Sequence, residues 1–213
     1  MISYILFDLD NTLYPESSPL GPELARRINA YAANYLGVSL EEAERLRQTE
    51  MCPYGTTMRW LMVRHGMTDI NDYIESIHPE DIASYISKDP RLPALLDSIA
   101  QPKSVLTNSS KNHATRVLRH LGIEERFEHL FDLSYSNFRG KPHRETYEQV
   151  LDSIARDPKE VLFVDDVPDY IRGFAEIGGK AVLIDEMDRR AGELKGIPSI
   201  RTLFELPPLI AEL

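Results

Sequence analysis

The chain has 213 residues, of which 42% are hydrophobic and 27% charged, so it can bury the core of one large domain or two smaller ones. Its formal net charge of −10 comes without a long run of Lys or Arg, which argues against polymeric nucleic acid or an anionic membrane surface as a partner. A single cysteine, Cys52, excludes an internal disulfide, and no stretch has the character of a signal peptide or membrane span, so we expect a cytoplasmic protein.

The first predicted element is a strand over residues 4–7, an apolar run of the kind that is buried on both faces of a parallel sheet. Asp8 and Asp10 follow it directly, at the strand end where open α/β sheets bind their ligands. If the strand geometry continues, both carboxylates point the same way and repel each other unless a cation lies between them. The stretch therefore predicts a divalent metal site.

Residues 16–89 predict an all-helical insertion, because apolar residues there recur at three- and four-residue spacings. Proline near a start, a capping-box pattern and glycines past the ends mark the boundaries. We expect helices over about residues 22–36, 39–50, 56–65, 69–77 and 79–86.

From about residue 90 strands and helices alternate to the end of the chain. We expect strands at 104–107, 131–133, 160–164 and 180–184, helices at 92–100, 111–121, 142–155 and 168–177, and a short helix in the tail 199–213. This order predicts an α/β fold with a Rossmann-like, doubly wound parallel sheet, which the first strand joins. The predicted organisation is an α/β core of residues 1–15 and 90–213, interrupted by a helical domain at 16–89.

Polar residues stand at the ends of further predicted strands. Thr107 and Asn108 precede a helix N-terminus, where free backbone N–H groups favour an anion such as phosphate. Lys141, in a short Gly-Lys-Pro loop, can neutralise a phosphate as a point charge. Asp165 and Asp166 complement the first acidic pair around a hard cation such as Mg²⁺.

Each of these segments also has a simpler interpretation when it is taken alone. A Thr-Asn-Ser-Ser run before a helix is typical of an N-cap, an Asp-Asp pair of a solvated turn, and a Gly-Lys-Pro of a loop. Their combination at successive strand ends favours a functional site.

These residues resemble the four signature motifs of the haloacid dehalogenase superfamily of phosphohydrolases. Residues 8–12 (DLDNT) match the first motif, Thr107 the second, Lys141 the third, and Asp165 with Asp166 the fourth. The insertion after the first motif has the position of that superfamily's helical cap.

Within this superfamily the cap segment resembles the pyrimidine 5′-nucleotidase branch. The resemblance rests on Asp8 to Pro15 and on Tyr54-Gly55-Thr56-Thr57, followed by Arg59 and then by His65-Gly66. It implies that Tyr54, Thr56, Thr57 and Arg59 contact a base or sugar. One departure concerns the fourth motif, where related sequences often carry Asn a few residues after the acidic pair and this chain has Asp169.

The resemblance implies a Mg²⁺-dependent phosphatase acting on a small phosphorylated metabolite, with a pyrimidine nucleoside 5′-monophosphate as the expected substrate. Asp8 would attack phosphorus, and Asp10 would protonate the leaving alkoxide and later activate water. The implied metal ligands are Asp8, the Asp10 backbone carbonyl, Asp166 and Asp165, and the implied phosphate ligands are Thr107, the Asn108 backbone N–H and Lys141.

Three alternatives remain beside this prediction: another phosphate ester such as a sugar phosphate, 2-haloacid dehalogenation, and a catalytically idle binding module. Asp10 argues against dehalogenation, because a departing halide needs no proton. The complete set of motifs argues against an idle module.

Overall fold

The computed structural model describes residues 1–190 and 192–213. Its described residues form a six-stranded sheet with the order β3-β2-β1-β4-β5-β6, and every neighbouring pair is parallel. The strands are β1 (Tyr4–Phe7), β2 (Lys103–Leu106), β3 (Leu130–Phe131), β4 (Val161–Asp165), β5 (Lys180–Ile184) and β6 (Ser199–Ile200). The predicted Rossmann-like α/β fold is confirmed.

Strand β1 lies in the middle of the sheet and positions the site. Phe7 stands opposite Val105 of β2 on one side and Val164 of β4 on the other. The chain builds outward from β1 through β2 to β3 in one direction and through β4 to β6 in the other. Such a reversal of strand order opens a crevice at the carboxyl ends of the central strands, and Asp8 and Thr107 follow two of them.

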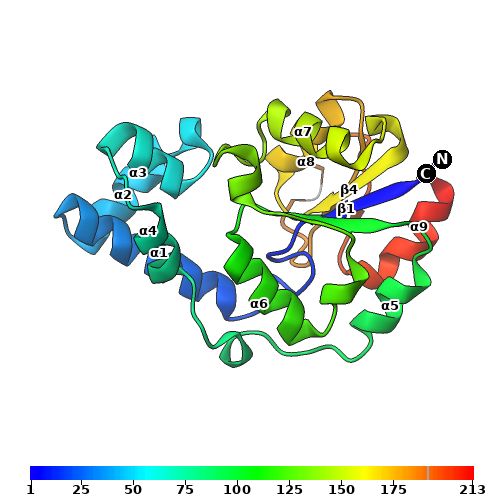
Figure 1. Ribbon diagram of the computed structural model, residues 1–213, viewed down its shortest axis with the longest axis horizontal. Coiled ribbons are helices and arrows are strands. Elements are labelled where there is room, and N and C mark those ends of the chain that lie inside the picture. The colour runs from blue at the N-terminus through cyan, green and yellow to red at the C-terminus, as the bar shows by residue number, and fades with distance from the viewer. Residues whose placement is uncertain (191) are drawn as a thin grey trace.

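Helices cover both faces of this sheet. The helices of the described residues are α1 (Leu20–Leu36), α2 (Leu40–Glu50), α3 (Thr57–His65), α4 (Ile70–Ile77), α5 (Leu92–Ser98), α6 (Lys111–Leu121), α7 (Arg144–Ile154), α8 (Pro168–Glu176) and α9 (Leu206–Glu212), and five of them, α5–α9, cover the sheet. Helices α7 and α8 pack on one face, and α5, α6 and α9 on the other (Figure 1). No helix among the described residues combines the length and apolarity needed to cross a membrane.

Alternate strand residues supply the two layers of the core. Ile5 and Phe7 belong to the cluster with α5, α6 and α9, whereas Tyr4 and Leu6 belong to the cluster with α7 and α8. Because both faces of β1 are buried, its sequence is a continuous apolar run rather than an alternation.

Helices α1–α4 form a helical lobe to one side of the sheet, on the left in Figure 1. Its hydrophobic cluster contains the fully buried Trp60 and Leu61, and two residues from the α/β part, Leu133 and Phe138, pack into it. Phe138 has a φ of 61°, which is uncommon for a bulky residue. The loop that carries Phe138 thereby connects the lobe to the sheet.

Two segments differ from the sequence prediction. The helix expected at 79–86 is wrong: only a single 3-10 turn, Ile82–Ser84, forms there. Ile82 and Ile86 are instead buried in the sheet-side core, so tertiary packing determines the path of this linker. In the tail, β6 precedes the expected helix. The sequence did not predict this strand, because two residues are too few to show a periodic pattern.

Candidate active site

Three carboxylates meet at the carboxyl ends of the neighbouring strands β1 and β4. Asp8 follows β1, Asp165 ends β4 and Asp166 comes next, and one oxygen from each lies within 4.8 Å of the others. All three side chains are buried. Buried like charges at this separation repel one another strongly, so the cluster requires positive charge.

Lys141 supplies part of this positive charge. Its fully buried Nζ donates to Asp8 Oδ1 and to Asp165 Oδ2, each at 2.6 Å. Burial opposes the charge on Lys141, but Asp165 and Asp8 outweigh burial and raise the pKa of the amine. Lys141 therefore stays protonated at neutral pH.

One lysine does not balance three carboxylates. Burial, with the charge of Asp8 as the next cause, raises the pKa of Asp166 to about 7. Burial likewise raises the pKa of Asp8 and of Asp165 against the opposing effect of Lys141. Convergent carboxylate oxygens with an excess of negative charge are the donor set that suits Mg²⁺, so the residues present fit the expected metal.

The loop that carries Lys141 is held by Asn108. Lys141 N donates to Asn108 Oδ1 at 2.7 Å, and Asn108 Nδ2 donates back to Lys141 O at 2.9 Å. Gly140 has a φ of 69°, and a Cβ at this position would overlap Asn108 Oδ1 and approach Leu133 Cδ1 to 2.7 Å. Only glycine fits here, and the Asn108 side chain is committed to the loop rather than to a ligand.

Thr107 lies at the end of β2 and is buried. Its Oγ1 accepts a hydrogen bond from Ser109 N at 3.0 Å, which leaves the hydroxyl hydrogen able to donate to an anion. The structure thus brings Thr107, Asn108 and Lys141 to the same sheet edge as the acidic cluster.

Asp10 is surrounded by hydrogen-bond donors. Tyr14 Oη donates to its Oδ1 at 2.7 Å, His113 Nε2 contacts the same oxygen at 2.9 Å, and Ser109 Oγ donates to Oδ2. Burial opposes ionisation, but the facing His113, followed by Ser109 and Tyr14, outweighs it and holds the pKa of Asp10 below its usual range. Asp10 is therefore ionised at neutral pH.

The sequence analysis missed Tyr14 and His113. His113 is 103 residues from Asp10 and meets it only because α6 packs beside the loop after β1. Near the fourth motif, Asn11 Nδ2 donates to Asp166 Oδ2 at 3.4 Å, whereas Asp169 is exposed and forms an ion pair with Arg172.

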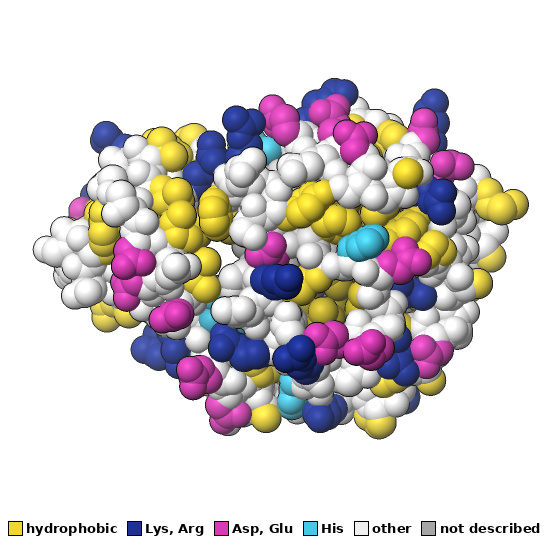
Figure 2. Space-filling model, in the orientation of Figure 1, with side chains coloured by type: hydrophobic (Ala, Val, Ile, Leu, Met, Phe, Trp, Pro, Cys, Tyr) yellow, Lys and Arg dark blue, Asp and Glu magenta, His cyan; other side chains and the backbone are white. Residues whose placement is uncertain are grey.

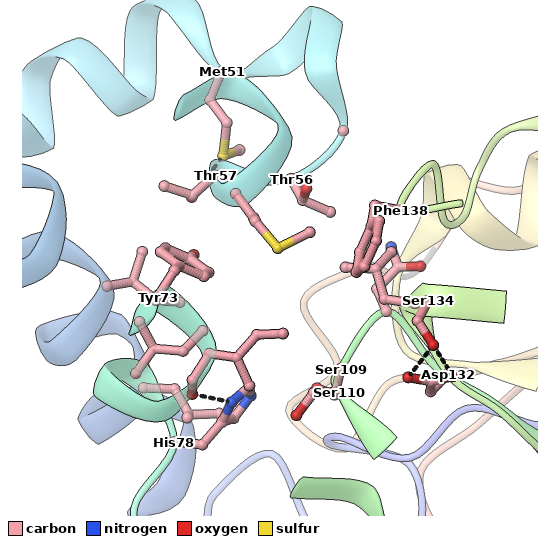
Figure 3. A pocket seen from close by; sticks show the side chains of 18 of the residues that line it. Met51, Thr56, Thr57, Tyr73, His78, Ser109, Ser110, Asp132, Ser134 and Phe138 are labelled. Carbon is pink, nitrogen blue, oxygen red and sulfur yellow. Dashed lines mark hydrogen bonds between the residues drawn. The ribbon is translucent and has the colours of Figure 1, made fainter. Parts of the chain in front are cut away.

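A cavity of about 280 Å³ lies between the helical lobe and the sheet edge. The space-filling view shows the surface hollowed where the two parts meet (Figure 2). The lobe contributes apolar side chains: Leu24, Ile28, Met51, Met58, Tyr73, Ile74 and Ile77. Ser109 and Phe138 face them from the sheet side (Figure 3), and Ser109 connects the cavity to Asp10.

The cap residues expected to contact substrate divide into two groups. Thr56 and Thr57 line the cavity, whereas Tyr54 and Arg59 are not among its described lining residues. Thr57 Oγ1 accepts from Arg47 Nε at 3.0 Å and donates to Met51 Sδ at 3.2 Å, so its one hydrogen is already used. Thr56 Oγ1 accepts from Arg59 N at 3.1 Å, which leaves its hydrogen for another partner.

Two curated proteins match parts of the chain. Phosphate metabolism protein 8 from Saccharomyces cerevisiae is 28% identical over 188 residues, which are 81% of this chain and 58% of the yeast protein. Bifunctional epoxide hydrolase 2 from Sus scrofa is 30% identical over 70 residues, which are 32% of this chain and 13% of the pig protein. The chain thus spans less than two thirds of the length of either relative.

Solved structures share the whole fold at low sequence identity. A HAD phosphatase from Thermococcus onnurineus superposes with a TM-score of 0.69 at 20% identity, over 99% of this chain and 98% of that one. L-2-haloacid dehalogenase from Xanthobacter autotrophicus, with chloropropionic acid covalently bound, gives 0.66 at 15% identity over all of both chains. The hydrolase family described as haloacid dehalogenase-like matches residues 2–178, and the chain belongs to this family.

Proposed function

We propose that the chain is a Mg²⁺-dependent phosphatase that works through an aspartyl-phosphate intermediate on pyrimidine nucleoside 5′-monophosphates. The observation that carries the phosphatase proposal is the convergence of Asp8, Asp10 and Lys141 at one sheet edge. This arrangement combines a nucleophile, a second carboxylate for proton transfer and a fixed positive charge. The names of the yeast relative and of the Thermococcus structure point the same way.

In the first step Asp8 attacks the phosphorus, and the bond between phosphorus and the leaving oxygen breaks. Lys141 holds Asp8 Oδ1, so the other oxygen is free to attack. Asp10 gives a proton to the departing alkoxide. Thr107 and Lys141 donate to the transferring phosphoryl oxygens.

In the second step water attacks the phosphorus of the aspartyl phosphate. Asp10 takes the proton of that water, phosphate leaves, and the Asp8 carboxylate is regenerated. Asp8, the Asp10 backbone carbonyl, Asp165 and Asp166 would hold Mg²⁺, which supplies positive charge against the repulsion between the anionic nucleophile and the anionic substrate.

Asp10 must gain a proton before it can act as an acid, since its pKa is lowered in the free site. An anionic phosphoryl group beside it favours the protonated form through like-charge repulsion. A phosphate ester that enters as its monoanion carries the required proton.

Carbon–halogen hydrolysis accounts less well for this site. Halide departure requires no proton, so the Asp10 carboxylate that the three donors orient would have no role in that reaction. The likeness to dehalogenase structures is one of fold, at 15% identity.

We propose further that residues 16–89 act as a cap that selects the leaving group. The lobe side of the cavity is largely apolar and includes the Tyr73 ring, with the Phe138 ring on the sheet side (Figure 3). A flat base suits such walls, whereas a sugar without a base would leave its hydroxyl groups unpaired there. Thr56 offers a hydroxyl for the polar edge of a small base.

A phosphate-release screen over nucleoside monophosphates and sugar phosphates, with Mg²⁺ or with chelator, tests both parts. We expect UMP or CMP to exceed AMP and GMP by roughly ten- to a hundredfold in kcat/KM, the effect of unpairing a buried polar group. Thr56→Val should erode this preference but leave p-nitrophenyl phosphate hydrolysis intact. Equal values for all four nucleotides, or a sugar phosphate far above them, would refute the nucleotidase part. Absence of phosphate release from every ester would refute the whole proposal.

A further inference from the structure

The two carboxylate oxygens of Asp10 receive different numbers of hydrogen bonds. Oδ1 receives Tyr14 Oη at 2.7 Å and His113 Nε2 at 2.9 Å, while Oδ2 receives Ser109 Oγ alone. A carboxylate oxygen has about two acceptor sites, so Oδ1 is saturated and Oδ2 keeps one free. Ser109 also lines the cavity, so the free site lies on the oxygen whose partner borders that cavity.

His113 differs from the other two donors in how firmly it is held. Tyr14 shares a loop with Asp10, and Ser109 lies at the cavity wall. His113 belongs to the first turn of α6, and its side chain is fully buried. It is therefore the contact that connects the Asp10 loop to a helix.

A second ring supports His113 from the lobe side. The ring of His78 stacks on it with centroids 4.4 Å apart and an interplanar angle of 25°. His78 itself is fixed by a hydrogen bond of 2.9 Å between Nδ1 and Ile74 O (Figure 3). Stacking limits the tilt of the His113 ring and keeps Nε2 directed at Asp10.

The tautomer of His113 follows from its two nitrogens. Nε2 faces a carboxylate oxygen, which only accepts hydrogen bonds, so Nε2 carries the hydrogen. Nδ1 has no partner among the described residues, and a buried ring nitrogen without a partner is a cost that simple packing would avoid. An apolar residue would fill this place without that cost, so the imidazole is retained for its contact with Asp10.

We infer that His113 is a positioning residue for proton transfer: it saturates Asp10 Oδ1 and directs the exchange with leaving group and water through Oδ2. The inference rests on the proposed phosphatase function. It assigns His113 no contact with substrate.

Two esters of similar size and different leaving groups test this role: p-nitrophenyl phosphate and benzyl phosphate. Departure of p-nitrophenolate needs little help from an acid, whereas benzyl alkoxide is a strong base that must be protonated. The ratio kcat/KM reports the step in which the leaving group departs, so it separates the two cases.

His113→Phe keeps an aromatic ring against His78 and removes the donor. We expect kcat/KM for benzyl phosphate to fall roughly ten- to a hundredfold, part of the usual contribution of a general acid, with little change for p-nitrophenyl phosphate. His113→Gln, which retains an N–H donor, should recover most of the loss. His120→Phe is the matched control, since His120 lies on the same face of α6 and contacts Ile86 O instead of the site.

A phosphoenzyme burst gives an independent readout. Because Asp10 also activates water in the second step, His113→Phe should show a rapid release of p-nitrophenolate followed by slow turnover. An equal loss of kcat/KM for both esters would show a merely structural role and overturn the inference, as would no loss for either. If the wild-type protein hydrolyses neither these two esters nor any nucleoside monophosphate, the proposed function itself fails.

A measurement on the wild-type chain tests the inference even if the variants do not fold. With ¹⁵N-labelled histidine, NMR should detect a hydrogen on Nε2 of His113 that exchanges slowly with solvent, and Asp10→Ala should accelerate that exchange. A hydrogen found on Nδ1 alone would overturn the inference whatever the variants do.

Discussion

At the scale of single residues, the site depends on one lysine among three carboxylates. Lys141 contacts Asp8 and Asp165 at 2.6 Å, inside the protein and without access to water. A buried charge that loses its partner costs far more than an exposed pair contributes. Stability and catalysis are therefore coupled at this position.

Replacing Lys141 by Met leaves the cluster without its cation. We expect the free energy of unfolding to fall by about 3–5 kcal/mol and phosphate release to be lost. Denaturant unfolding measures the first and a phosphate assay the second. In contrast, Asp8→Asn should abolish turnover while the protein stays folded, because it removes one of the repelling carboxylates. Full stability in Lys141→Met would contradict this account of the cluster.

His78 predicts a pH dependence of stability. Burial, with the neighbouring His113 as the next cause, lowers its pKa from 6.5 to about 4. Below pH 6.5 His78 binds a proton more readily in the unfolded chain than in the folded chain. The contribution of His78 to the free energy of unfolding is therefore complete above pH 6.5 and declines as the pH falls towards 4. The slope reaches at most about 1.4 kcal/mol per pH unit. Unfolding free energies of the wild type and of His78→Gln should therefore converge between pH 7.5 and 5, and parallel curves would exclude the effect.

At the scale of elements, short loops at the carboxyl ends of strands present the functional groups, and their shape depends on particular backbone angles. The loop before α7 contains Asn137, Phe138 and Gly140, all with positive φ. One side of this loop places Phe138 in the helical lobe, and the other places Lys141 among the carboxylates. The same loop thus serves both the cavity and the catalytic cluster.

Gly140→Ala tests this loop. Its Cβ would overlap Asn108 at a φ of 69°, so we expect a loss of about 1–3 kcal/mol in stability together with a loss of activity as Lys141 shifts. Gly37→Ala is a matched control, because Gly37 has a similar φ of 66° and no atom within 4 Å of the added Cβ. It should cost stability alone, and equal activity in both variants would argue against a role for Gly140 in placing Lys141.

At the scale of the whole molecule, the cavity of the site lies between the sheet edge and the helical lobe. Its acidic cluster holds more negative charge than Lys141 balances, which makes a bound cation a source of stability for the whole fold. Metal binding and unfolding are then linked by mass action.

Mg²⁺ should raise the unfolding temperature of the metal-free protein. At a free concentration of one hundred times Kd the gain is about 2.7 kcal/mol. Asp166→Asn should remove most of this effect, whereas Asp169→Asn should keep it, since Asp169 is exposed and paired with Arg172. Differential scanning calorimetry with and without Mg²⁺ measures the shift, and an identical shift in both variants would place the metal elsewhere.

The fold class and the places of the polar residues at strand ends follow from local patterns in the sequence. An apolar run of four residues such as Tyr4–Phe7 and the helical spacing of residues such as Leu24 and Ile28 are local properties, and they predict β1 and α1 without knowledge of distant contacts. At residues 79–86 tertiary packing overrides the local periodicity, and a prediction based on local properties therefore fails there.

The surroundings of those polar residues depend on contacts that form only in the folded protein. The contacts of Asp10 with Ser109 and His113 join positions 99 and 103 residues apart, and the cavity is lined from the helical lobe, the β2–α6 turn and the Phe138 loop. No local pattern encodes such contacts, because they depend on how helices pack on the sheet and on each other. The residues proposed to carry out the chemistry can therefore be predicted from the sequence, whereas the residues that hold them in place can be identified only in the folded structure.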